Sequence, residues 1–182
     1  MSTPDADAPE EITWQGDWIT TKKRGRWEYV SRAREIRAAV ILAVENGKII
    51  LVEQYRVPLG MRCLELPAGL IGDDDGGADD DPLRAAKREL LEETGYEARN
   101  WEVVGEFFSS PGMVSESFTL LKATGLVKSG PGGGVEGEDI VVHRVKLSEF
   151  PGILDDFRGG DVGIDTRLLI ALGPYLLGER TA

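Results

Sequence analysis

Three glutamates, Glu89, Glu92 and Glu93, are clustered in the segment DPLRAAKRELLEETGY. Residues at positions i, i+3 and i+4 share one side of a helix, so a helix here would gather three carboxylates on one patch of surface. Like charges this close destabilise a helix unless cations compensate them, and hard divalent cations prefer oxygen ligands. The patch is therefore a candidate site for a divalent metal and a phosphate substrate. A solvated acidic face is the alternative, and the glutamates alone do not exclude it.

The residues around this patch predict the helix that it requires. Asp81 is a suitable N-cap, and Pro82 suits the first helical turn. Gly95 can adopt the left-handed conformation that ends a helix. Apolar residues recur at helical spacing between these ends and give the helix a face to bury.

The segment from Arg88 to Tyr96 matches the core of the Nudix box, Arg-Glu-apolar-x-Glu-Glu-x-Gly-apolar, at every fixed position. The chain thus resembles the Nudix hydrolases, and the segment from Glu65 to Ile71 resembles the strand and glycine loop that precede this helix in the family. An acidic insertion at residues 72–79 lengthens the loop, and Asp80 stands where the family has a further glutamate. The resemblance implies an α/β fold, the Nudix α/β/α sandwich with a mixed sheet, plus a small N-terminal antiparallel sheet.

In this family the helix holds magnesium ions, which manganese can replace, and these activate a diphosphate for attack by water. The metal ligands implied by the resemblance are the Ala68 carbonyl, Glu89, Glu92 and Glu93. In the family a glycine-rich mobile loop also supplies a catalytic glutamate, and the segment from Gly134 to Ile140 resembles this loop. The implied catalytic residues are Glu136 as the first choice of general base, Glu138 as the second, and Glu92.

Residues outside the box indicate a substrate class. Pro111 follows Gly95 at the distance that marks the ADP-ribose pyrophosphatases, although an ordinary Ser-Pro-Gly turn is the simpler explanation of that proline alone. The strand ending at Arg56 resembles one whose arginine contacts the diphosphate. The N-terminal strands resemble those that these enzymes exchange between subunits. The implied substrate-binding residues are Trp18, Trp27, Arg32, Arg56, Pro111 and Glu116, with interface packing as the alternative role of the tryptophans.

The function implied is magnesium-dependent hydrolysis of ADP-ribose, or a related ADP-sugar, to AMP and ribose 5-phosphate by a homodimer with exchanged N-terminal strands. Cleavage of GDP-mannose, NADH or a flavin dinucleotide is one alternative. A non-catalytic Nudix domain that senses nucleotides is another. The intact glutamates argue against a sensor, because a binding module has no need of metal ligands.

Composition narrows the classes of partner. A net charge of −11 argues against a nucleic-acid surface that works through phosphate contacts. The single cysteine, Cys63, allows no internal disulfide and is compatible with a cytoplasmic location. No segment has the length of a membrane span, and the acidic N-terminus is unlike a signal peptide. His143 alternates with valines, so we expect it to take no part in metal binding.

Three regions are expected along the chain. Residues 1–11 are predicted to be a disordered acidic tail, 12–37 a β-sheet region for dimerisation and substrate binding, and 38–182 the Nudix domain. Asn46-Gly47 predicts a hairpin between two apolar strands. Residues 129–134 are predicted to form a flexible loop, and 162–177 to form a helix.

Overall fold

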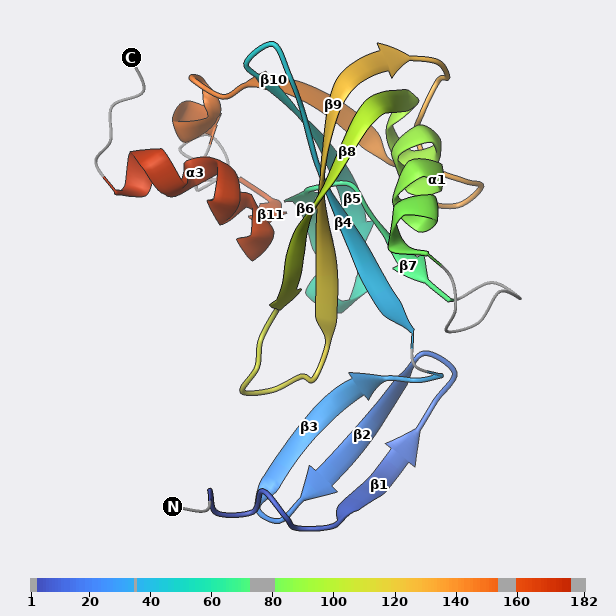
Figure 1. The fold of residues 1–182 in the computed structure, drawn as a ribbon, viewed down its shortest axis with the longest axis vertical. Coiled ribbons are helices and arrows are strands. Elements are labelled where there is room, and N and C mark those ends of the chain that lie inside the picture. The colour runs from blue at the N-terminus through green and yellow to red at the C-terminus, as the bar shows by residue number, and fades with distance from the viewer. Residues whose placement is uncertain (1–2, 35, 73–80, 154–159, 178–182) are drawn as a thin grey trace.

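The structure is a computed structural model that describes residues 3–34, 36–72, 81–153 and 160–177 (Figure 1). Most of the acidic insertion, and Asp80, lie outside these residues. The helices and strands are β1 (Glu10–Gln15), β2 (Ile19–Arg24), β3 (Trp27–Arg32), β4 (Arg37–Glu45), β5 (Lys48–Arg56), η1 (Val57–Leu59), β6 (Met61–Glu65), β7 (Ala68–Ile71), α1 (Pro82–Thr94), β8 (Tyr96–Phe108), β9 (Ser117–Lys128), β10 (Val141–Lys146), β11 (Val162–Ile164), η3 (Thr166–Leu168) and α3 (Leu169–Leu176).

The first three strands form a separate antiparallel sheet in the order β1-β2-β3. Figure 1 shows this sheet projecting from one end of the larger body. Strand β1 begins at Glu10, so residues 10 and 11 pair with β2, although they were assigned to the tail from the sequence. The small N-terminal sheet expected from the sequence is confirmed.

The larger sheet is mixed and runs in the order β11-β6-β5-β4-β9-β8, with β10 paired to β5 and β7 paired to β4. The β4–β9 and β11–β6 pairs are parallel, and the others are antiparallel. The β4–β5 hairpin turns at Asn46 and Gly47, both of which have positive φ, as a type I′ turn requires. The hairpin predicted from these two residues is therefore confirmed.

Helices α1 and α3 cover opposite sides of this sheet (Figure 1). Each side has its own apolar core. One core packs Leu90 and other α1 residues against Ile50 and Leu121. The second packs Leu172 of α3 against the other side of the strands. The α/β/α sandwich expected from the sequence is confirmed.

Residues 162–177 differ from the single helix predicted for them. They begin with β11, which pairs in parallel with Arg62–Leu64 of β6. The Asp165 side chain then accepts a hydrogen bond from the Arg167 amide and caps η3, and α3 begins only at Leu169. Pairing with a neighbouring strand therefore overrides the helical periodicity at the start of this segment. Within the described residues, no helix is both long and apolar enough to span a bilayer.

Candidate active site

A cavity of about 800 Å³ lies beside the larger sheet, next to Glu89 in the middle of α1 and to Arg32 at the end of β3. It collects residues that are far apart in the sequence. The residues predicted as site residues that line it are Arg32, Arg56, Ala68, Glu89, Glu116 and Glu138. It is called the cleft below.

Helix α1 is fixed at both ends as its sequence predicted. The Asp81 carboxylate accepts a hydrogen bond from the Leu83 amide, and Gly95 ends the helix with φ of 69°. The helix packs so closely on β7 that a Cβ at Gly69 would overlap the side chain of Glu89. Glycine at this position therefore lets the carboxylates of α1 approach the backbone of the glycine loop.

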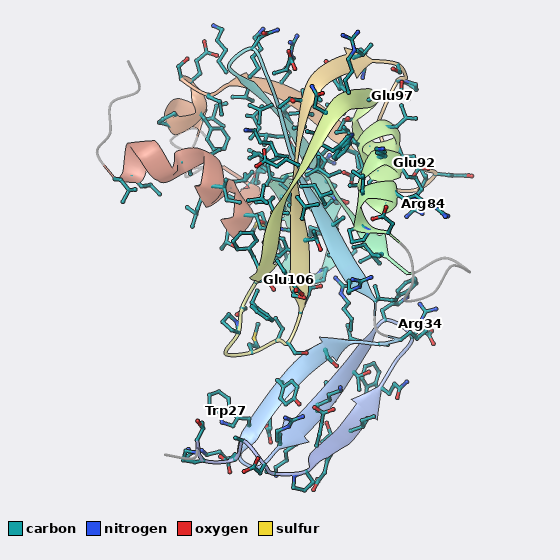
Figure 2. All side chains as sticks on the ribbon, viewed as in Figure 1. Trp27, Arg34, Arg84, Glu92, Glu97 and Glu106 are labelled. Atoms are coloured by element: carbon teal, nitrogen blue, oxygen red, sulfur yellow. The ribbon has the colours of Figure 1, made fainter. Side chains whose placement is uncertain are left out.

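The three carboxylates of α1 differ in their surroundings. Glu93 is buried with 4% of its surface exposed, and its carboxylate accepts a hydrogen bond of 3.1 Å from the Ala68 amide. Glu89 is partly buried and bonded to Arg88. Glu92 lies on the exposed side of α1 (Figure 2), 4.0 Å from Arg88.

Burial governs the ionisation of the two inner carboxylates. The pKa of Glu93 is raised from 4.5 to about 8, mainly by the loss of solvent and also by the charges of Glu89 and Glu138, although the hydrogen bond from the Ala68 amide acts to lower it. Burial is also the main cause that raises the pKa of Glu89, with Arg88 opposing it. Two carboxyl groups are thus held in a poorly solvated place that disfavours their ionised forms unless a cation is bound.

This arrangement fits a hard divalent cation in its chemistry, because the donors are carboxylate oxygens that lack solvent and repel one another. Glu89, Glu92 and Glu93 are the side chains that would hold it, with the Ala68 carbonyl as a backbone ligand. Among the described residues, no three acidic, histidine or cysteine side chains already form a ligand set. Arg88 contacts Glu89 and would have to release it to a cation.

The opposite wall of the cleft carries arginines whose positions are fixed by carboxylates. Arg56 donates two hydrogen bonds, of 2.6 and 2.7 Å, to Glu65, which is 2% exposed. Arg167 donates to the same carboxylate at 3.3 Å and to Asp165 at 2.7 and 2.8 Å. Paired and partly desolvated guanidinium groups are orientated to receive phosphate oxygens.

The remaining arginine of the cleft comes from the N-terminal sheet. Arg32 donates a hydrogen bond of 2.6 Å to Glu116, whose other oxygen accepts one from the Ser109 hydroxyl at 3.4 Å. Arg32 and Glu116, which were each predicted to bind substrate, therefore contact one another. It joins the end of β3 to the segment before β9.

The two candidate bases are placed differently. Glu138 lines the cleft, and its charge acts on Glu89 and Glu93. Glu136 is exposed and is not among the lining residues. The geometry therefore favours Glu138 over Glu136 as the candidate base, whereas the sequence analysis placed Glu136 first. The Glu138 carboxylate accepts a hydrogen bond of 2.9 Å from the Val135 amide, which holds this side chain within the loop.

The tryptophans and Pro111 are outside the cleft within one chain. Trp27 and Pro111 line a second, smaller cavity of about 400 Å³, between the N-terminal sheet and residues 111–115. Trp18 is half exposed and lies under the Arg34 guanidinium at 5.2 Å. Figure 2 shows Trp27 at the end of the N-terminal sheet, far from Glu92. A single chain therefore does not bring these aromatic rings to the carboxylates.

Sequence analysis missed Glu65, Asp165 and Arg167 as site residues. Glu65 carried a usable signal, because a glutamate inside the apolar run CLELP must find a cation when the strand is buried. Its partner Arg167 lay in a segment assigned to a helix, and only the β11–β6 pairing brings it there. Cys63 also lines the cleft, and burial raises the pKa of its thiol to about 11, which leaves it unreactive. His143 bonds to Glu53, outside the cleft lining.

Comparison with known proteins agrees with this geometry. The family model of the NUDIX domain matches residues 33–128. The methanol dehydrogenase activator of Bacillus methanolicus is 40% identical over 110 residues, 60% of this chain and 56% of that protein. The ADP-ribose pyrophosphatase of Mycobacterium tuberculosis is 40% identical over 112 residues, 61% of this chain and 52% of that protein. This chain therefore spans little more than half the length of these two relatives.

Two further similarities cover more of the chain. The GDP-mannose pyrophosphatase of Cronobacter sakazakii is 36% identical over 144 residues, which are 71% of each chain. A crystal structure of an ADP compounds hydrolase superposes with a TM-score of 0.67 over 94% of this chain and 93% of that chain. At 21% sequence identity, this likeness shows that the two proteins share a fold.

Proposed function

Because the chain belongs to the Nudix family, whose domain matches residues 33–128, we propose that it hydrolyses the diphosphate of ADP-ribose or a related ADP-sugar, with magnesium as its metal. Water would cleave the bond between the two phosphates and release AMP and ribose 5-phosphate. The observation that carries the proposal is the cleft, which is lined by Glu89 of α1 on one side and by Arg32, Arg56 and Arg167 on the other. The names of the relatives from Mycobacterium tuberculosis and Cronobacter sakazakii support a nucleoside diphosphate sugar as the substrate class.

In the proposed reaction the chain's own residues position the diphosphate and the attacking water. Arg56 and Arg32 bind phosphate oxygens, and Glu65 and Glu116 keep their guanidinium groups in place. Glu89, Glu92, Glu93 and the Ala68 carbonyl would hold a divalent cation, which would supply positive charge and acidify the water. Glu138 accepts the proton of that water, because it is the loop carboxylate that lines the cleft.

One panel assay tests this function directly. Purified protein with magnesium, and in parallel with manganese, is given ADP-ribose, ADP-glucose, GDP-mannose, NADH and a flavin dinucleotide, and phosphate is measured after phosphatase treatment. We expect the highest kcat/KM for an ADP-sugar and no turnover with a chelator. A clear preference for GDP-mannose would favour the alternative substrate. Binding of ADP-ribose without any turnover would favour the nucleotide sensor.

We further propose that two chains form a homodimer in which the N-terminal strands complete the partner's cleft. The N-terminal sheet carries large exposed apolar side chains, including Trp14, Trp18 and Trp27, each more than half exposed. Such exposure marks a surface that another protein covers. In a symmetric dimer the same strands would reach the partner's cleft, where a tryptophan could stack on the adenine.

Mixing two inactive variants tests this shared site. A Trp27→Ala chain and a Glu93→Gln chain are each expected to be weakly active. In a mixed dimer one site would combine the intact tryptophan with the intact carboxylates. With random exchange of subunits we expect about a quarter of wild-type activity, well above the sum of the separate variants. A monomeric wild type by light scattering, or no recovery in dimers shown by mass spectrometry to have exchanged, would contradict the shared site.

A further inference from the structure

The first part of the loop that carries Glu138 is hydrogen-bonded to the C-terminal end of α1. The Gly133 amide donates to the Glu93 carbonyl at 2.8 Å, and the Gly134 amide donates to the Glu92 carbonyl at 3.0 Å. These carbonyls belong to the last turn of the helix, where no further helical amide is available. The backbone of the glycine run is therefore tied to the same residues whose side chains are the candidate metal ligands.

The other end of the loop is held by Arg62 of β6. One terminal nitrogen of Arg62 lies 3.1 Å from the Asp139 carboxylate, and the other donates to the Asp139 carbonyl at 3.0 Å. Asp139 directly follows Glu138 and has a φ of 48°, a conformation that an L-residue adopts at a cost. Arg62 thus binds both the side chain and the backbone carbonyl of Asp139, the residue next to Glu138.

Arg62 is itself positioned by a partly buried acidic residue. Its Nε donates to the Glu53 carboxylate at 2.6 Å, and one terminal nitrogen donates to the Glu53 carbonyl at 3.0 Å. The second oxygen of Glu53 lies 2.9 Å from Nε2 of His143. The Glu53 side chain is 14% exposed and that of Arg62 28% exposed. The Arg62 guanidinium group is therefore held in place by residues of the sheet as well as by its contacts with the loop.

Arg62 does not line the cleft, whereas its neighbour Cys63 does, as expected from the alternation of side chains along β6. The contact that links Arg62 to the loop of Glu138 is the one with Asp139. We infer that Arg62 is a positioning residue that fixes the Glu138 carboxylate over the cleft by clamping Asp139 to Glu53. This inference rests on the proposed role of Glu138 as the general base.

The first test is the Arg62→Met variant of the full chain, which keeps the length of the side chain and removes all four contacts. A base displaced by about 1 Å costs up to ~100-fold in rate, so we expect kcat to fall roughly 10- to 100-fold with little change in KM. Arg62→Lys should recover only part of this loss, because one ammonium cannot bridge Glu53 and Asp139 together. Arg144→Met is the matched control, since Arg144 is an exposed arginine of β10 whose side chain has no hydrogen bond or ion pair to any described residue. An unchanged kcat in folded Arg62→Met would overturn the inference.

A double variant shows whether Arg62 acts through Glu138. If it does, Arg62→Met added to Glu138→Gln should cause no further loss, because the group that it positions is already disabled. Additive losses would mean that Arg62 acts by another route. Asp139→Asn keeps the backbone contact and loses the ion pair, so its effect should be smaller than that of Arg62→Met.

Hydrogen exchange separates this inference from the proposed function. Amides of residues 135–140 should exchange faster in Arg62→Met than in wild type or Arg144→Met, whichever substrate the protein uses. Unchanged exchange there would overturn the clamp even if the enzyme were active. If the wild type hydrolysed no compound of the panel, the proposed function would fail, and the exchange rates would still report on the clamp.

Discussion

Glu93→Gln is expected to reduce kcat by roughly 100- to 1,000-fold, as does the loss of one preorganised electrostatic contact in other active sites. The substitution keeps the size of the side chain and its ability to accept the hydrogen bond of the Ala68 amide. It removes the anionic charge that a divalent cation would require from the most buried ligand. Turnover of ADP-ribose at saturating magnesium and substrate is the measurement.

The same variant should not be destabilised, and the reason is the pKa of Glu93. In the metal-free protein this pKa is about 8, compared with 4.5 for an ordinary glutamate, so the folded state binds the proton more tightly than the unfolded chain does. The stability that this group contributes is complete below pH 4.5 and is lost as the pH rises through 8. Thermal melting in chelator should therefore show a smaller decrease across this range for Glu93→Gln than for wild type.

Glu102→Gln is the matched control, because Glu102 is an exposed glutamate of β8 outside the cleft. It should leave both kcat and the melting profile as in wild type. Glu92→Gln should be less damaging than Glu93→Gln, since its side chain is 42% exposed and nearer to water. Magnesium-dependent hydrolysis that stays near wild type in the combined Glu89→Gln and Glu93→Gln chain would show that the metal site lies elsewhere.

The parts of the site that depend on local sequence were predictable. Asp81, Pro82 and Gly95 define the ends of α1 because capping uses only residues next to the helix. The turn at Asn46 and Gly47 is equally local. Spacing along α1 then determines which glutamates share a surface. For these elements a few neighbouring residues contain the information that the structure uses.

The arginine wall of the cleft was only half predictable, because its partners are distant in sequence. Arg56 was identified, but Arg167 joins it at Glu65 only when β11 pairs with β6. The helical periodicity of residues 162–177 concealed this short strand. No local pattern specifies that a three-residue segment will add to the edge of a sheet. Tertiary pairing therefore decides which charges meet.

The glycine-rich loop shows a similar limit. Residues 129–134 were expected to be flexible, yet four of their amides donate to carbonyls of α1 and Gly95. The run of glycines alone predicts a flexible backbone. In the structure, carbonyls at the end of α1 that lack a helical partner accept hydrogen bonds from the amides of this run. The position of the following glutamates depends on these contacts.

Glu138→Gln is expected to lower kcat by about 100-fold or more, the usual effect of removing a general base. Glutamine can still accept the hydrogen bond of the Val135 amide, so the turn that presents residue 138 should persist. KM should change little if the side chain acts on the water rather than on the substrate. Turnover at saturating ADP-ribose and magnesium measures this effect.

Glu136→Gln is the control two residues away in the same loop. Glu136 is exposed and outside the lining of the cleft, so its substitution should leave kcat within about twofold of wild type, as is usual for a surface change. The two variants have the same change in charge in the same loop. They differ in position, because only Glu138 lines the cleft near the carboxylates of α1. A loss confined to Glu136→Gln would restore the order suggested by the sequence, with Glu138 turned away during catalysis. No loss in either variant would mean that the water is deprotonated without this loop, which leaves the carboxylates of α1 as the remaining candidates for the base.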